Sequence, residues 1–475
     1  MPVDSTNWAD LLLLPEAPAP GLPAHRRVYL ALRGLILDGT LGAGARLPPT
    51  RALARSLGVS RSAAIAAFEQ LLAEGHAVAR VGAGTFVAAA GPVPRPRAQN
   101  QVPTAPSPAA GALPFTIGQA AADPRTMAQF RGSLARRLRR FDPQHLCYGD
   151  PRGTPELRES IAHMLRTARG VRAEAGNIVI VSGTQHAFGL ALRAILPPGG
   201  RVWVEDPCYP AFLTALAGVG GRAVPVPVDA QGLDVAAGIT AAPDASAAYV
   251  TPSHQYPLGV VMGMQRRLAL LDWARGAGAW IIEDDYDSEV RFSGRSLAAL
   301  QGLDASGRVL YIGTFSKVLF PGLRCGYLVV PPALMDAVLA VRAATDRQPP
   351  TLLEGAIADL LDSGAFAAHL RRLRARHRAS RDVLAAALAR HCAPWLDVEV
   401  PDQGLHLVAR LRGGGDDVAL AAAAARVGIA VRPLSSMHLA RQPVAGLVLG
   451  FTGFADVALE RAAEALGRVL AGIRS

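Results

Sequence analysis

The chain has 475 residues, 50% of them hydrophobic, so it is too long for one ordinary domain and can bury a large core. Its formal net charge of +11 points to a polyanionic partner. The N-terminus lacks a signal-peptide pattern, and no charge-free apolar run reaches the roughly 18 residues of a membrane span. The four cysteines form neither a CxxC pair nor a metal-like cluster. These three observations together favour a location in the cytoplasm.

Residues 22–90 show the pattern of a small helical domain that ends in a hairpin. The expected elements are helices over residues 25–39, 50–58 and 61–74 and strands over residues 76–81 and 85–89. Ser60 can cap the third helix, and glycines at 82 and 84 mark the hairpin tip. This order predicts a winged helix-turn-helix, whose third helix enters the major groove of DNA. Eight arginines against three carboxylates in this segment fit phosphate contacts.

This domain resembles the GntR family of bacterial DNA-binding domains. The resemblance rests on LPPTR at 47–51, LGVSR at 57–61 and the wing GAGTFV at 82–87. It implies that DNA is contacted by Thr50, Arg51, Ser60, Arg61, Gly84 and Thr85. After Ser60-Arg61 the family usually has polar or β-branched residues, whereas this chain has Ser-Ala-Ala, so the operator sequence cannot be read from the family. The alternative is a helical packing module with no role on DNA.

Residues 91–112 separate this domain from the rest of the chain. They contain six prolines and almost no large apolar side chain, so they cannot form a packed core. We interpret them as a semi-extended linker between a DNA-binding domain at 22–90 and a large domain at 113–475.

The large domain is expected to be an α/β domain. Short β-branched runs alternate with helical stretches, which is typical of buried strands in a largely parallel sheet. The runs cover residues 177–183, 201–207, 223–228, 247–253, 280–286, 309–316 and 326–330. Sites in such sheets lie at the carboxyl ends of the strands, and polar motifs follow several of these runs directly.

Lys317 is the one lysine of the chain, and the other 48 basic residues counted with it are arginines. An arginine keeps its proton in a protein, whereas a lysine amine can lose it and attack a carbonyl. A position that stays lysine in such an arginine-rich sequence therefore predicts a Schiff-base nucleophile.

Other motifs of the large domain indicate which further groups the ligand of Lys317 carries. Ser182, Gly183 and Thr184 open a helix, where backbone N–H groups bind phosphate, and Thr314 and Arg324 flank Lys317 with a hydroxyl and a guanidinium. The clustered carboxylates at 283–287 need a partner such as a protonated ring nitrogen. Tyr209 either stacks on a flat ring or packs in the core. An aldehyde, a phosphate and a ring nitrogen together describe pyridoxal 5′-phosphate (PLP).

The large domain resembles a fold-type I aminotransferase, and its fusion to a GntR-type domain resembles the MocR family of bacterial transcription regulators. The motifs are YGDPRGTPELR, TPSHQYPLG, IIEDDYDSE and GTFSKVLFPGLRCGYLV. The resemblance implies a small C-terminal α+β subdomain, a homodimer, and these roles: Lys317 for the Schiff base, Asp284 for the pyridine nitrogen, Tyr286 for the ring hydroxyl, Tyr209 for stacking, and Ser182, Gly183, Thr184, Thr314, Arg324 and a neighbouring subunit's Tyr148 for the phosphate. Asp285 remains the alternative to Asp284.

One departure bears on activity. Aminotransferases usually hold the substrate carboxylate with an arginine in a C-terminal segment, and the matching residues 447–451 have none. Arg432 either replaces it or is a solvated surface residue. We therefore expect a PLP-dependent regulator that binds operator DNA and senses PLP or its adduct with an amine or amino acid. The alternatives are a working aminotransferase with a DNA-binding domain and a DNA-binding protein whose large domain serves only dimerisation. No membrane and no metal are expected.

Overall fold

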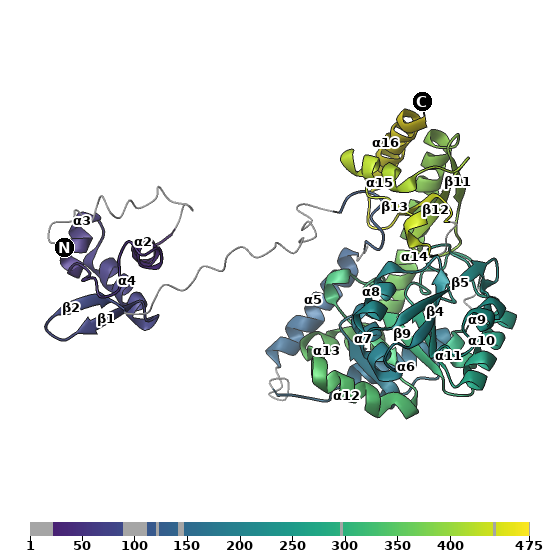
Figure 1. The fold of residues 1–475 in the computed structure, drawn as a ribbon, viewed down its shortest axis with the longest axis horizontal. Helices are drawn as coiled ribbons and strands as arrows, with labels where there is room; N and C mark the ends of the chain where they lie inside the picture. Colours follow the sequence, from purple (N-terminus) through teal and green to yellow (C-terminus); the bar gives the residue numbers. More distant parts are fainter. Residues whose placement is uncertain are drawn as a thin grey trace. The chain divides into compact units, whose positions relative to one another are not determined.

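The computed structural model describes residues 22–88, 112–119, 123–140, 147–294, 298–439 and 443–474. The chain divides into two compact units, residues 1–107 and 108–475, and each is described by itself (Figure 1). The linker predicted at 91–112 lies outside the described residues except for Ala112. In the described part, no helix combines the length and the apolar character needed to cross a bilayer.

The first unit is a winged helix-turn-helix, as predicted. Its elements are α2 (Ala24–Leu37), α3 (Thr50–Ser56), α4 (Arg61–Ala73), β1 (Ala77–Arg80) and β2 (Gly84–Val87). Val28, Leu32, Leu53 and Leu71 are fully buried between the three helices. The Ser60 hydroxyl accepts a hydrogen bond from the Ala63 N–H at 3.2 Å, so it caps α4 as the sequence predicted.

The second unit is built on an eight-stranded sheet in the order β3-β10-β9-β8-β7-β4-β5-β6. The strands are β3 (Ile178–Val181), β4 (Arg201–Asp206), β5 (Arg222–Asp229), β6 (Gly232–Leu233), β7 (Ala247–Val250), β8 (Trp280–Asp285), β9 (Val309–Thr314) and β10 (Gly326–Val329). The central strands β5, β4, β7, β8 and β9 pair in parallel, whereas β10 is antiparallel to both neighbours. Residues 315–325 are too few for the crossover helix that a parallel return requires, so the chain reverses directly.

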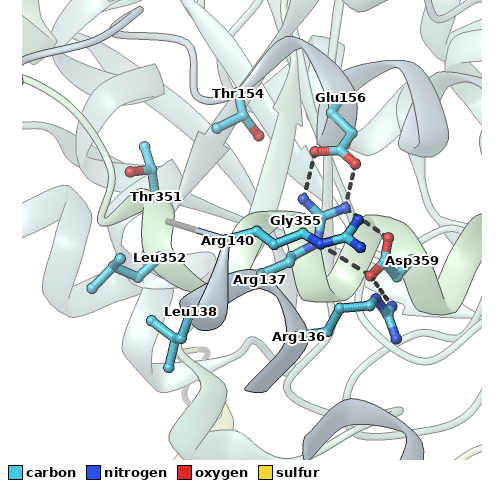
Figure 2. Close-up of a pocket in the computed structure, with 10 residues that line it drawn as sticks. All are labelled: Arg136, Arg137, Leu138, Arg140, Thr154, Glu156, Thr351, Leu352, Gly355 and Asp359. Atoms are coloured by element: carbon cyan, nitrogen blue, oxygen red, sulfur yellow. Dashed lines mark hydrogen bonds and ion pairs between the residues drawn. The ribbon is translucent and has the colours of Figure 1, made fainter. Parts of the chain in front are cut away.

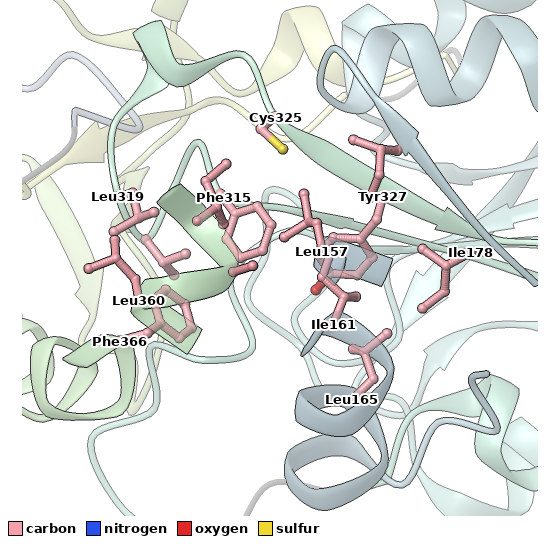
Figure 3. Close-up of a cluster of buried hydrophobic side chains, with 14 of the residues drawn as sticks. Leu157, Ile161, Leu165, Ile178, Phe315, Leu319, Cys325, Tyr327, Leu360 and Phe366 are labelled. Carbon is pink, nitrogen blue, oxygen red and sulfur yellow. The ribbon is translucent and has the colours of Figure 1, made fainter. Parts of the chain in front are cut away.

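Helices cover both faces of this sheet. They are α5 (Pro124–Arg139), α6 (Pro155–Arg169), α7 (Thr184–Ile195), α8 (Pro210–Gly218), α9 (Val235–Ala241), α10 (Met264–Ala277), α11 (Leu300–Leu303), α12 (Met335–Thr345) and α13 (Glu354–Asp362). Ile178 and Ile180 of β3 belong to the core with α6 and α13, and Val179 and Val181 belong to the core with α7. Figure 3 shows the first of these cores, where α6 lies beside Tyr327. Alternate residues of one strand thus fill both layers, which explains why the strands read as continuous apolar runs.

The C-terminal residues form the small α+β subdomain that the resemblance implied. Its elements are α14 (Ala365–His391), β11 (Leu396–Glu399), β12 (His406–Leu411), α15 (Asp417–Arg426), β13 (Arg432–Pro433), β14 (Gly446–Gly450) and α16 (Asp456–Arg474). The strands make an antiparallel sheet in the order β11-β12-β14-β13. In Figure 1 these elements lie at the end of the unit that carries the C-terminus.

A buried ion pair fastens the end of α6 to the end of β8. The Arg169 Nε donates to Asp285 Oδ2 at 2.9 Å, and Tyr311 donates its hydroxyl hydrogen to the same oxygen at 2.5 Å. Arg169 also donates to the Ser253 hydroxyl at 2.7 Å. Both charged side chains are almost fully buried. An interior charge is stable only while its partner remains.

We expect Arg169→Leu to lower the free energy of unfolding of the large unit by about 3–5 kcal/mol, because it leaves Asp285 charged and unpaired in the interior. The measurement is urea unfolding followed by circular dichroism. The matched control is Arg275→Leu, which removes the exposed pair between Arg275 and Asp272 and should change stability by less than about 1 kcal/mol. Equal stability of the two variants would contradict a structural role for the Arg169–Asp285 pair.

Candidate functional site

A pocket opens where β7, β8 and β9 end. Its walls are formed by Ile117, Gly118, Thr184, Tyr209, Tyr249, Thr251, Tyr256, Asp284, Tyr286, Lys317, Leu405, His406 and Arg432. Six of the residues singled out from the sequence are among them, and they come from four different strand ends and from the small subdomain. The parallel strands and their short connections therefore bring together residues that lie far apart in the sequence.

Lys317 follows β9 and reaches the pocket beside Gly118. Gly118 has a φ of +76°, and a Cβ at this position would overlap Lys317 Nζ. Burial of the amine lowers its pKa, and the positive charge of Arg432 lowers it further, while Asp287 and Asp284 act in the opposite direction. A lowered pKa increases the neutral fraction of the amine at neutral pH, and the neutral amine is the form that attacks a carbonyl.

Asp284 and Asp285 point to different surroundings, although they are adjacent. Asp284 lines the pocket and accepts a hydrogen bond from the Tyr249 hydroxyl at 3.0 Å, while its buried Oδ1 has no partner. Asp285 also leaves one oxygen without a partner, but it does not line the pocket and is held by Arg169. Burial raises the pKa of Asp284 to about 7. A protonated ring nitrogen at Asp284 Oδ1 would satisfy this oxygen and stabilise its charge.

Two aromatic residues with predicted roles also line the pocket. Tyr209 precedes α8 and packs edge-to-face on Tyr256, with ring centroids 5.2 Å apart. It also packs against core residues, while its stacking on a flat ring stays a prediction. Tyr286 directly follows the last residue of β8, and its hydroxyl is 3.0 Å from His254 Nδ1.

Most of the predicted phosphate-binding residues meet at the start of α7. Gly183 precedes this helix with a φ of +94°, and Thr184 is its first residue. Arg324 lies against Gly183, and its Nη2 donates to the Ser182 carbonyl at 2.5 Å. Thr314 is nearby through β10, because Gly326 pairs with Thr314 and lies against the Gly183 Cα. The Thr314 hydroxyl accepts a hydrogen bond from the Ser316 N–H at 3.1 Å.

Tyr148 is separate from this group within the chain. Its side chain is 73% exposed, it does not line the pocket, and the Arg347 guanidinium lies 3.8 Å from its ring centroid. This position leaves the tyrosine available to a second subunit, which is where the resemblance implied its role.

Arg432 lines the pocket and is exposed to solvent. Its Nη1 donates to the Tyr256 hydroxyl at 3.3 Å. In the small sheet, Arg432 on β13 pairs with Val448 on β14. Arg432 therefore lies on the strand beside residues 447–451 and lines the pocket, and its role toward a carboxylate stays a prediction.

Sequence reasoning assigned no role to several side chains in or beside the pocket, among them Tyr249, His254 and His406. Tyr249 lies inside an apolar run, and its hydroxyl supports Asp284; a polar tip in a buried strand was the available signal. His254 lies in the TPSHQYPLG motif, but the sequence assigned no role to this histidine. His406 begins β12, bonds the Pro257 carbonyl through Nε2 at 2.9 Å, and has a pKa lowered to about 3 by burial. Nothing in the sequence around His406 indicated that the small subdomain would bring it to Lys317.

The predicted DNA-contacting residues all belong to the first unit. Arg51, Ser60 and Arg61 are exposed at the starts of α3 and α4, and Thr50 is the half-buried first residue of α3. Gly84 is exposed at the start of β2, and the Thr85 carbonyl accepts from the Leu47 N–H at 2.8 Å. Helix starts present free N–H groups to phosphate, so this placement suits a DNA surface.

A second cavity of the large unit is lined by side chains that form ion pairs with one another. Figure 2 shows Arg137 between Glu156 and Asp359, with Arg136 also directed at Asp359. The carboxylates thus neutralise two of the arginines, and the cavity contains none of the residues predicted for a site.

Comparisons with known proteins agree with this geometry. Residues 24–87 match the family of bacterial regulatory proteins called gntR, and residues 133–466 match aminotransferase class I and II. The probable rhizopine catabolism regulatory protein MocR of Rhizobium meliloti is 39% identical over 91% of this chain and 90% of its own length. The pyridoxine biosynthesis regulator PdxR of Corynebacterium glutamicum is 32% identical over 88% of this chain and 90% of its own.

Among solved structures, the kynurenine aminotransferase of Pyrococcus horikoshii, solved with PMP, is 26% identical and has a TM-score of 0.70 over 76% of this chain and 91% of its own. The match extends over the large unit, where the pocket lies. The chain therefore belongs to the MocR family of regulators, in which a GntR-type DNA-binding domain is joined to a domain of the PLP-dependent aminotransferase class I and II family.

Proposed function

We propose that this protein is a DNA-binding transcription regulator whose large domain binds PLP and senses it, alone or joined to an amine or amino acid. The observation that carries the proposal is the presence of Lys317 and of Asp284 Oδ1 in one pocket. The first is a buried amine with a lowered pKa, and the second is a buried oxygen without a partner in the same pocket. The chain that contains this pocket also has a GntR-type domain.

Each predicted residue has a distinct task in this proposal. PLP supplies an aldehyde that reacts with amines and a ring that withdraws electrons. Lys317 presents the amine, Asp284 holds the proton of the ring nitrogen, and Tyr286 donates to the ring hydroxyl. The start of α7 and Arg324 bind the phosphate. Arg432 in the pocket binds the carboxylate of an amino acid effector. These carboxylate and phosphate contacts orient the bound molecule from two ends.

The regulator is proposed to act as a homodimer in the cytoplasm. The exposed Tyr148 supports the homodimer, because it lies outside the pocket of its own chain and can reach the phosphate site of a second copy. A dimer also brings two winged helices to two half-sites of an operator, where Thr50, Arg51, Ser60, Arg61, Gly84 and Thr85 contact DNA. Occupation of the pocket then changes how the two helices meet their half-sites.

A catalytic alternative is favoured by the same pocket. Lys317, Asp284 and the Arg432 cation in the pocket are the groups that a working aminotransferase needs, so turnover of amino acids is the second candidate function. We place regulation first because β14 lacks the usual carboxylate-binding arginine and because Arg432 is shared with Tyr256.

We expect PLP to give the protein an absorption band near roughly 420 nm that is lost in Lys317→Ala. Lys317 is the one lysine, so borohydride reduction followed by peptide mapping should place the label on a single side chain. Thr351→Ala, which alters the second cavity, is the control and should keep the band. A label on any peptide other than the one with Lys317 would contradict the proposed attachment.

We expect PLP to change either the affinity or the footprint of the protein on the DNA upstream of its own gene. In Arg61→Ala, affinity should fall and the slope of log affinity against log salt should decrease by about one, because a phosphate contact is lost. Arg275→Ala, with an exposed arginine of the large unit, should match the parent. Identical affinity and footprint with and without PLP would exclude sensing through the large domain.

We expect Arg432→Met to retain PLP but to lose about tenfold or more in affinity for amino acids, because one charge-assisted hydrogen bond to the carboxylate is removed. Titrations with amino acids and with the amines that lack the carboxylate, followed by the visible band, measure this. Arg410→Met, on strand β12 of the same sheet, is the control. In the same solutions, transamination by the parent faster than about one turnover per second would favour the enzyme.

A further inference from the structure

A buried pair stands behind Tyr286. His254 Nδ1 lies 2.8 Å from Asp287 Oδ2, and both side chains are about 1% exposed. The Tyr286 hydroxyl lies 3.0 Å from the same nitrogen. Tyr286 lines the pocket, whereas His254 and Asp287 do not, so the pair reaches the pocket through the tyrosine and through His406, whose ring centroid lies 5.6 Å from that of His254.

The geometry around His254 Nδ1 restricts the tyrosine. An imidazole nitrogen has one in-plane position, which holds either a hydrogen or a lone pair. The short contact with Asp287 uses this position whichever of the two groups carries the hydrogen. The hydroxyl hydrogen of Tyr286 therefore does not need to go to Nδ1, and the acceptors left to it are the Asp287 carboxylate and a group in the pocket.

The same surroundings keep Tyr286 protonated. Burial raises the pKa of its hydroxyl well above the ordinary value, and the negative charge of Asp287 raises it further. A tyrosine in this state acts as a hydrogen-bond donor and does not carry a charge of its own.

The backbone around the pair is built to hold the imidazole in place. Gly404 has a φ of +91°, and a Cβ there would overlap the His254 ring and approach Asp287 Oδ2 to 3.1 Å. Gly259 faces the other edge of the ring, where a Cβ would be 3.2 Å from Nε2. Because these two positions are glycines, the His254 ring fits between them. Glycine costs conformational entropy on folding, so this arrangement indicates more than a space-filling role for the ring.

We propose that His254 and Asp287 are positioning residues for Tyr286: they fix its hydroxyl and keep it a donor toward the phenolic oxygen of PLP. The inference rests on the proposed binding of PLP at Lys317, and it goes beyond it by assigning a role to two residues outside the pocket. It also explains why Asp287, two residues after the end of β8, has a buried carboxylate.

The test is the pH midpoint of the visible absorption band of the PLP-bound protein. A hydrogen bond from Tyr286 favours the charged phenolic oxygen, so loss of this donor should raise the midpoint. We expect Tyr286→Phe to raise it by about one pH unit. We expect His254→Leu to raise it in the same direction, and the double variant to match Tyr286→Phe alone, because both changes remove one interaction.

His254→Asn is the conservative variant, since an amide can replace the Nδ1–H toward Asp287, and it should return the midpoint toward that of the parent. The other titratable groups that face the cluster are unchanged in all variants: Asp284, Asp285, Tyr256, Lys317, His406 and Arg432. Thermal unfolding and PLP stoichiometry establish that each variant is folded and loaded.

The outcomes are distinguishable. Additive shifts of His254→Leu and Tyr286→Phe, or an unchanged midpoint in a loaded His254→Leu, would overturn the positioning role and leave the proposed function intact. If His254→Leu does not fold, a midpoint for His254→Asn that equals that of Tyr286→Phe overturns it as well, while one near the parent supports it. A parent that shows no band overturns the proposed function and this inference together.

Discussion

The architecture of the large domain depends on the burial of negative charge at the end of one central strand. Glu283, Asp284, Asp285 and Asp287 are each no more than 4% exposed, and ionised carboxylates are costly to remove from water. Three are compensated by the protein. The N–H groups of α11 donate to Glu283, Arg169 pairs with Asp285, and His254 pairs with Asp287. Asp284 alone is left facing a cavity, supported by one tyrosine hydroxyl.

This division of partners shapes the surroundings of β8. Arg169 ties α6 to the strand, and the loop after β7 brings His254 to Asp287, so the layers on the two sides are positioned by ionic contacts as well as by apolar packing. In the pocket this compensation is incomplete, because Asp284 Oδ1 has no partner there. A buried carboxylate with a strongly perturbed pKa in a pocket often marks a binding site.

Much of this could be predicted from the sequence, because short-range chemistry determined it. The cap at Ser60, the apolar runs of the sheet and the unusual lysine at 317 are local signals, and each corresponds to the feature that the structure contains. The direction of β10 was not apparent, since an apolar run does not state its orientation. The roles of His254 and His406 depend on contacts between residues about 30 to 150 positions apart, and one sequence carries no record of such contacts.

The direct reversal between β9 and β10 has a consequence for how the protein can respond to a ligand. Lys317 and Arg324 lie on one short connection between two strands that are hydrogen-bonded to each other. Both residues are therefore anchored to the central sheet. Arg432 and His406 belong instead to the small subdomain, which is joined to the sheet through α14. Any rearrangement that reports occupancy must then arise from the side of the small subdomain, while the strand side serves as the stationary reference.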